Sequence, residues 1–212
     1  MVALPSMQNI IAFPEKQKSN EWYTPSYIIE AARKVLGTID LDPASCEQAN
    51  QVVRATRFYT KEDNGLAQDW SGNVWLNPPY SSIKSTKGLG GGKLRGPTRL
   101  FIAKLLNDFE DGNVSQAIAC VNADTNRAWF QALWKYIFCF ASRPVHFYKP
   151  DDEGLLQKDS RNCSFFGTAF VYLGNNDAAF IREFSTFGHI AKSIAGPRRE
   201  TVQATSLWGG GR

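Results

Sequence analysis

The sequence predicts an α/β fold with a mostly parallel, twisted sheet, helices on both faces and an antiparallel element at its C-terminal edge. Two observations predict it. Apolar segments with strand and helix periodicity alternate through the first part of this chain of 212 residues, and such alternation is typical of parallel sheets. The later strand-like segments follow one another closely, at 137–140, 145–148 and 165–173, and close spacing favours antiparallel pairing.

The first helix is expected to begin at Thr24-Pro25. Thr24 can cap it, and Pro25 suits the first helical position because its missing N–H costs nothing there. Apolar side chains from Tyr27 to Leu36 recur at helical spacing, and Gly37 is placed to end the helix. The other expected elements are, in order, a strand at 38–41 that stops at Asp42-Pro43, a weak helix at 49–59, a loop at 61–72, a strand at 73–76, a helix at 98–109, a strand at 117–121 and an aromatic-rich helix at 125–136.

The composition is that of a globular protein, with 43% hydrophobic and 21% charged residues. No apolar run approaches the roughly 20 residues of a transmembrane helix, and residues 1–20 lack the pattern of a secretory signal, so we expect a cytoplasmic protein that does not bind membranes. The four cysteines are scattered and accompanied by two histidines, so no metal site is expected. Residues 1–20 are expected to form a flexible leader, 21–194 one domain and 195–212 a disordered tail.

The sharpest motif is Asn77-Pro78-Pro79-Tyr80, which directly follows the apolar run Val74-Trp75-Leu76. In an open α/β sheet the ligand crevice lies beyond the carboxyl ends of the strands. The prolines remove two backbone donors and stiffen the chain, which leaves the Asn77 oxygen and the Pro78 carbonyl free to accept both hydrogens of an exocyclic amino group. Tyr80 offers a face on which a base can stack. The alternative is an ordinary turn after a strand.

A basic, glycine-rich stretch at 81–97 leaves this motif. No acidic residue occurs from Ser81 to Asn107, although the net charge of the whole chain is only +4. The stretch is either a solvated loop or one that orders on DNA while its side chains contact phosphates. The candidate DNA-binding residues are Lys84, Lys87, Lys93, Arg95 and Arg99.

Several blocks occur together in one order. They are Glu21-Trp22-Tyr23-Thr24-Pro25, Asp40-Leu41-Asp42-Pro43-Ala44-Ser45, Asp63-Asn64-Gly65-Leu66 with Trp70, and Asn77-Pro78-Pro79-Tyr80. The tetrapeptide resembles the target-nitrogen motif of amino-group methyltransferases that use S-adenosylmethionine. From Glu21 to about Gly174 the chain resembles, more closely, the phage and prophage family of DNA N6-adenine methyltransferases of the Dam type.

This resemblance implies a Rossmann-like methyltransferase fold with S-adenosylmethionine as cofactor. By position in the family's motifs, one group of residues would contact the methionine end of the cofactor, a second would lie under it and a third would bond its adenine. These groups are Trp22, Tyr23, Thr24 and Pro25; Asp42, Pro43, Ala44 and Ser45; and Asp63 and Asn64. For the third group a plain loop turn remains the alternative. Where wider relatives carry a glycine-rich turn, this chain reads Ser45-Cys46-Glu47-Gln48.

The resemblance implies transfer of a methyl group to the N6 of an adenine flipped out of double-stranded DNA, by direct in-line attack and without a metal. Asn77, Pro78, Pro79 and Tyr80 would be the catalytic residues. The alternatives are a methyltransferase acting on an RNA base or a glutamine amide, and a non-catalytic DNA-binding remnant. We interpret Trp129, Phe130, Trp134 and Tyr136 as core residues. Phe165 and Phe166 either flank the flipped base or belong to a strand core.

Overall fold

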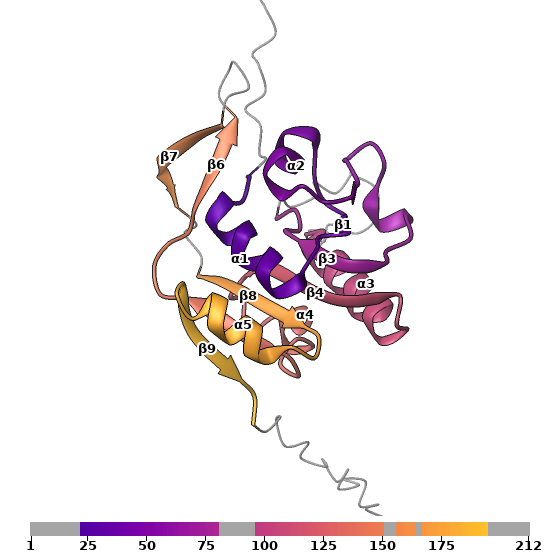
Figure 1. Cartoon of the computed structure of the whole chain (residues 1–212), viewed down its shortest axis with the longest axis vertical. Coiled ribbons are helices and arrows are strands. Elements are labelled where there is room, and N and C mark those ends of the chain that lie inside the picture. The colour runs from indigo at the N-terminus through magenta and orange to yellow at the C-terminus, as the bar shows by residue number, and fades with distance from the viewer. Residues whose placement is uncertain (1–21, 81–95, 151–155, 164–166, 195–212) are drawn as a thin grey trace, which may run out of the picture.

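The computed structural model describes residues 22–80, 96–150, 156–163 and 167–194 (Figure 1). Seven strands form one sheet in the order β2-β1-β3-β4-β8-β5-β9, and β6 pairs with β7 in a separate hairpin. The elements are α1 (Ser26–Leu36), β1 (Leu41–Asp42), α2 (Glu47–Val53), β2 (Arg57–Phe58), the 3₁₀ helix η1 (Gly65–Ala67), β3 (Gly72–Leu76), α3 (Thr98–Glu110), β4 (Val114–Asn122), α4 (Ala128–Gln131), β5 (Ile137–Ala141), β6 (His146–Pro150), β7 (Leu156–Cys163), β8 (Thr168–Leu173), α5 (Asp177–Phe184) and β9 (Gly188–Lys192).

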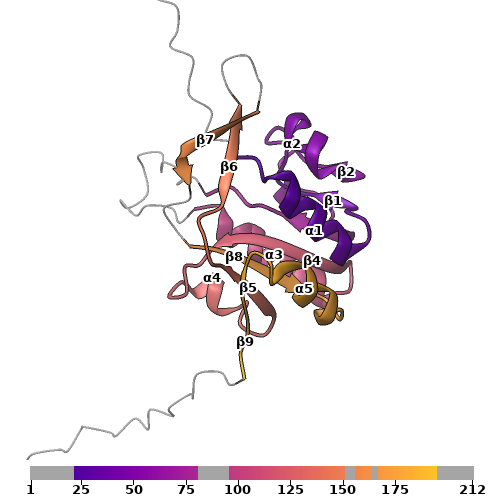
Figure 2. The same cartoon turned by 60° about the vertical axis from the view of Figure 1, so that its left-hand side comes forward.

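Five strands of the sheet point the same way. β2, β1, β3 and β4 pair in parallel, and β8 lies antiparallel between β4 and β5, so β5 shares their direction. β9 closes the sheet antiparallel to β5. The predicted α/β fold with a mostly parallel sheet and an antiparallel C-terminal part is therefore confirmed, and it is compatible with a Rossmann-like methyltransferase fold. The β6–β7 hairpin stands away from the main sheet in both views (Figures 1 and 2).

Helices cover both faces of the sheet, as predicted. Along β3, Trp75 joins the core cluster beneath α1 and α5, whereas its neighbours Val74 and Leu76 join the cluster beneath α3 and α4. This alternation is the period of two that places successive strand residues on opposite faces. The second cluster holds the aromatic residues interpreted as core: Phe130 is fully buried in it, and Trp129, Trp134 and Tyr136 are partly buried against the cluster.

The predicted elements differ from the structure mainly at their ends. The expectation that Thr24 caps the first helix is wrong, because α1 begins at Ser26 with Pro25 at the N-cap position and no side-chain cap. Gly37 ends the helix with a positive φ of 80°, as expected. The expected helix at 125–136 shortens to the single turn of α4, and the segment at 49–59 divides into α2 and β2.

Besides β2, four elements were not expected from the sequence: η1, β7, α5 and β9. Among the described residues, no helix is long and apolar enough to cross a membrane, and no group of side chains could hold a metal ion. Several predictions fall outside the described residues and stay predictions. They concern the leader at 1–20, the tail at 195–212, most of the basic stretch, Phe165 and Phe166.

Candidate active site

The candidate site lies where the sheet reverses its strand order. From β1 the chain reaches β2 on one side and then returns to β3 on the other side. β1 and β3 pair directly, with Leu41 opposite Val74 and the Asp40 N–H donating to the Asn73 carbonyl at 2.8 Å. Such a switch point opens a crevice beyond the carboxyl ends of the two central strands. Those ends carry Asp42-Pro43 and Asn77.

After β1 the chain makes a closed turn over residues 42–45. The Ala44 N–H donates to Oδ1 of Asp42 at 3.3 Å, which is the side-chain turn that aspartate favours. Tyr59 holds the backbone of the turn from both sides, since its N–H donates to the Asp42 carbonyl at 3.0 Å and its carbonyl accepts from the Ser45 N–H at 2.9 Å. The turn is thus fixed by β2 without a glycine-rich segment.

The carboxyl group of Asp42 is buried in this turn, with only 3% of its surface exposed. Burial raises the pKa of Asp42 to about 7, because the charged form loses its hydration, while the hydroxyl of Ser45 and the Ala44 N–H partly oppose the rise. The Ser45 oxygen itself is buried and, apart from this interaction with the Asp42 carboxyl, has no hydrogen-bond partner within the described residues. The turn therefore presents a titratable acid and an unsatisfied hydroxyl.

The next loop packs directly on the 42–45 turn at Gly65. A Cβ built on Gly65 would lie 2.0 Å from the Pro43 carbonyl oxygen, so only glycine permits this approach. The indole N–H of Trp70 donates to the Gly65 carbonyl at 2.7 Å and anchors the loop in the core. The 42–45 turn itself has no glycine. The glycine that allows a second piece of backbone to pack closely on this turn is Gly65, 20 residues after Ser45.

Asp63 and Asn64 immediately precede Gly65, at the exposed rim of the same loop. Oδ2 of Asp63 accepts hydrogen bonds from the N–H and the hydroxyl of Thr60, both at 2.8 Å, and these bonds lower the pKa of Asp63. Asn64 has the left-handed φ of 53°. The carboxylate closes a turn, as the structural alternative expected, and its second oxygen remains at the rim.

The segment before α1 crosses from the hairpin to the crevice. Tyr23 pairs with Tyr148 of β6 through two backbone hydrogen bonds of 2.9 Å. Its buried hydroxyl accepts a hydrogen bond from the Cys46 thiol at 3.3 Å, next to the 42–45 turn. This segment therefore contacts Cys46, the residue that follows the 42–45 turn.

The same segment orients the amide of Asn77. Nδ2 of Asn77 donates to the Trp22 carbonyl and to Oγ1 of Thr24, both at 3.4 Å. A carbonyl oxygen can only accept, so the amide nitrogen must face it and the amide oxygen must face away. Thr24 does not cap α1; its hydroxyl oxygen accepts this hydrogen bond from Asn77 instead.

Tyr80 and Pro79 are fixed by two other elements. The Tyr80 hydroxyl donates to the Cys120 carbonyl at 2.7 Å and lies 3.3 Å from Oδ1 of Asn77. Because the hydroxyl has one hydrogen, the shorter bond takes it and leaves the Asn77 oxygen largely available. Burial of the hydroxyl, followed by the proximity of Cys120 and Asp124, raises the pKa of Tyr80 well above its ordinary value. Meanwhile the side chain as a whole is 36% exposed, so its ring borders solvent.

Thr98 completes the platform, since its hydroxyl donates to the Pro79 carbonyl at 2.8 Å. Within the described part of the chain, the Pro78 carbonyl accepts no hydrogen bond. Among the described residues, the platform therefore offers two acceptors: Oδ1 of Asn77, whose one contact is the longer one to the Tyr80 hydroxyl, and the Pro78 oxygen. Sequence reasoning did not identify Thr98, although its place beside Pro97 at a helix start was a usable signal.

The structure brings together most of the residues predicted for the site. The segment 22–25, the 42–45 turn and the Asn77-Pro78-Pro79-Tyr80 motif are joined by the contacts above, and the loop of Asp63 and Asn64 adjoins them through Gly65. Arg99 is exposed in the first turn of α3, next to Thr98. Lys84, Lys87, Lys93 and Arg95 lie outside the described residues.

The chain belongs to the DNA N-6-adenine-methyltransferase (Dam) family, whose model matches residues 13–161. It is 32% identical over 85 residues to an Escherichia coli (strain K12) protein named "Putative methyltransferase YfdM", a match that covers 37% of this chain and 90% of that protein. No solved structure matches the chain. Membership of this family identifies the protein as a methyltransferase, and its matched region contains every site residue described above.

The raised pKa of Asp42 predicts how stability varies with pH. The native state binds this proton more tightly than the unfolded state, so the free energy of unfolding should fall as pH rises from about 4 to about 7, by at most ~4 kcal/mol. Asp42→Asn should flatten that fall, and chemical denaturation across this pH range measures it. Asp69→Asn, at an exposed carboxylate, is the control. Identical profiles for both variants would contradict the burial argument.

Gly65→Ala should disturb the 42–45 turn. Its Cβ would collide with backbone atoms of Pro43, which cannot move aside as a flexible side chain could. We expect a loss of about 1–3 kcal/mol in the free energy of unfolding. Gly167→Ala is the matched control, because its Cβ would meet Ala123 at an ordinary 3.5 Å. Equal stability of the two variants would show that Gly65 does not brace the turn.

Proposed function

We propose that this methyltransferase transfers the methyl group of S-adenosylmethionine to the N6 of adenine in DNA. The observation that carries the proposal is the orientation of the Asn77 amide. Two acceptors hold its nitrogen, so its oxygen faces away from them, one residue before the Pro78 carbonyl, which accepts no hydrogen bond from the described residues. Adenine specificity is the activity for which the matched family is named.

The residues at the end of β1 fit the adenosyl cofactor. The buried Ser45 oxygen lacks a full hydrogen bond, and ligands commonly satisfy such atoms. The buried Asp42 carboxyl belongs to the same turn as Ser45. The carboxylate oxygen of Asp63 that does not bond Thr60 lies at the rim of the crevice. We propose that residues 22–25 and 42–45 hold the methionine and central parts of the cofactor, and that Asp63 and Asn64 bond its adenine. When bound, S-adenosylmethionine supplies an electrophilic methyl group for in-line attack.

Asn77 and Pro78 would act on the target nitrogen. An exocyclic amino group has two hydrogens, and Oδ1 of Asn77 and the Pro78 oxygen can accept one each. Accepting both turns the nitrogen lone pair out of conjugation with the ring and aims it, which is positioning with electrostatic assistance. The exposed face of Tyr80 can stack on the base, a contact worth roughly 1–3 kcal/mol.

The substrate that we propose is double-stranded DNA with the target adenine flipped out. Flipping costs a few kcal/mol, which contacts to the backbone and stacking must offset. Lys84, Lys87, Lys93 and Arg95 follow the catalytic motif in the sequence, and Arg99 lies exposed beside Thr98. We propose that these cations bind phosphates. The reaction would take place with cytoplasmic DNA of a bacterial or phage-infected cell.

Transfer of isotope from methyl-labelled S-adenosylmethionine tests the function. The protein is incubated with DNA, RNA and protein in parallel, and each product is digested to nucleosides or amino acids. We expect label in N6-methyl-2′-deoxyadenosine from the DNA. Label found only in RNA or only in glutamine would show that the substrate is RNA or protein and not DNA. DNA binding without calorimetric binding of S-adenosylmethionine would identify a non-catalytic remnant.

Asn77→Ala should abolish most methyl transfer while leaving cofactor affinity nearly intact. The variant loses the acceptor for one amino hydrogen but retains every side chain assigned to the cofactor. A drop of about 100- to 1,000-fold in kcat is expected, the size seen when one such polar group is removed. Asn113→Ala, at an exposed position outside the crevice, should match the wild type. If Asn77→Ala kept its activity, the Asn77-Pro78-Pro79-Tyr80 motif would not have the catalytic role that we propose.

Thr24→Val tests whether the segment before α1 positions Asn77. Valine keeps the shape of threonine but lacks the oxygen that accepts from Nδ2 of Asn77. We expect kcat to fall about fivefold, since one neutral hydrogen bond is worth about 1 kcal/mol, and cofactor Kd to rise by no more than that, because Thr24 also belongs to the segment proposed to hold the cofactor. Thr24→Ser restores the acceptor and should restore kcat. A change in cofactor Kd with kcat unchanged would show that Thr24 does not position Asn77.

A further inference from the structure

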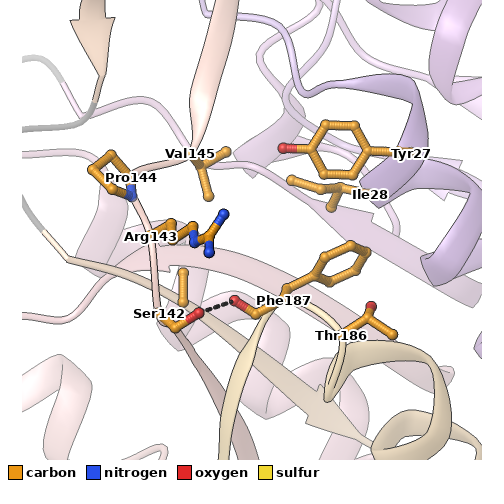
Figure 3. Close-up of a pocket in the computed structure, with 9 residues that line it drawn as sticks. Tyr27, Ile28, Ser142, Arg143, Pro144, Val145, Thr186 and Phe187 are labelled. Atoms are coloured by element: carbon orange, nitrogen blue, oxygen red, sulfur yellow. Dashed lines mark hydrogen bonds between the residues drawn. The ribbon is translucent and has the colours of Figure 1, made fainter.

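A second concave site lies at the first turn of α1. It has a volume of about 430 Å³, within the range of about 300–1,000 Å³ that is typical of small-ligand sites. Its walls come from the first turn of α1, the connection between β5 and β6, and the turn before β9. We call it the Arg143 pocket; Figure 3 shows Tyr27, Ile28, Arg143, Val145 and Phe187 around it.

The Arg143 pocket combines aromatic faces with one positive charge. Tyr27 is 53% exposed, and its ring centroid lies 5.7 Å from that of Phe187. The guanidinium of Arg143 faces these rings across the pocket (Figure 3). No carboxylate lines the pocket, and within the described residues none forms an ion pair with Arg143. This lining suits a ligand in which a flat ring is linked to a negatively charged group.

The turn that carries Arg143 is held in place. The N–H and the hydroxyl of Ser142 both donate to the Phe187 carbonyl, at 3.0 Å and 3.2 Å. These bonds tie the connection after β5 to the segment that supplies the aromatic wall. The backbone that carries Arg143 is therefore held next to the backbone that carries Phe187, which limits the ordering needed for one ligand to bind both side chains.

The Arg143 pocket and the catalytic motif open at the same edge of the sheet. β5 runs in the same direction as β3, so Ala141 and Asn77 both lie beyond carboxyl ends. Three strand spacings separate β3 from β5 in the sheet order, which is roughly 14 Å, or about four base-pair steps of B-DNA. In addition, Thr24 contacts Asn77 while Tyr27, within one helical turn, lines the pocket.

We infer that the Arg143 pocket binds one nucleotide of the substrate DNA away from the flipped adenine, with its phosphate on the guanidinium and its sugar or base against Tyr27. The inference rests on the proposed function for the identity of the polymer. Arginine suits phosphate because its planar fork donates two parallel hydrogen bonds. Aromatic side chains accept any base face without reading sequence. The site would therefore position DNA and contribute affinity without specificity.

Binding of a short fluorescent duplex containing adenine tests the inference, measured by anisotropy at several salt concentrations. All variants carry Asn77→Ala as well, so that methyl transfer cannot affect the result. Arg143→Ala should weaken binding about tenfold and reduce the slope of log affinity against log salt by about one. Tyr27→Leu should weaken binding and Tyr27→Phe should not. Arg182→Ala, which removes an exposed arginine that does not line the pocket, is the charge-matched control.

The outcomes separate this inference from the proposed function. If Arg143→Ala behaves like Arg182→Ala in a protein that methylates DNA, the inference is wrong and the function stands. If Arg143 is required for DNA binding but no label reaches DNA, the inference stands and the function is wrong. Tight binding of a deoxynucleoside monophosphate that duplex DNA does not displace would assign the pocket to a free nucleotide and overturn the inference. Circular dichroism and thermal unfolding confirm that each variant is folded.

Discussion

The parallel pairing of β1 with β3 is the constraint on which the rest of the site depends. Leu41 lies opposite Val74, and the short contact of Asp40 with Asn73 sets this register. A shift by one residue would turn every side chain of β3 to the opposite face, exchanging Trp75 with Val74 and Leu76 between the two cores. With the register fixed, the strands deliver the 42–45 turn and the Asn77 motif to one crevice.

The segment before α1 couples the two halves of that crevice. On one side Tyr23 meets Cys46, which follows the 42–45 turn, and on the other Trp22 and Thr24 hold the Asn77 amide. Backbone bonds to Tyr148 fix the segment against the hairpin. Trp22 and Thr24, which the family resemblance assigned to the cofactor, therefore also hold the Asn77 amide. Under the proposed function, cofactor binding and base positioning would share one short piece of chain.

Local signals were enough to predict much of the fold, but not the contacts that orient the site. Neighbouring residues in the sequence determine the apolar stripe of α1, its end at Gly37 and the end of β3 just before Asn77-Pro78. α5 also carried local signals that went unused, since Asn176 caps it and Phe180 and Phe184 recur at helical spacing. By contrast, the bond between Thr24 and Asn77 joins residues 53 positions apart, and the approach of Gly65 to Pro43 depends on how two loops pack. Such contacts exist only once the sheet is assembled, so Thr24 was predicted as a cap.

The central claim is that one crevice holds the methyl donor and the adenine amino group side by side, and a bisubstrate analogue tests it most directly. In such a compound a short linker joins the adenosyl part of the donor to N6 of adenine. Calorimetry should show that it binds at least about 100-fold tighter than either half, as expected for a mimic of the transition state, and that Asn77→Ala removes the advantage. An affinity no higher than that of its tighter half, unchanged in Asn77→Ala, would contradict the account.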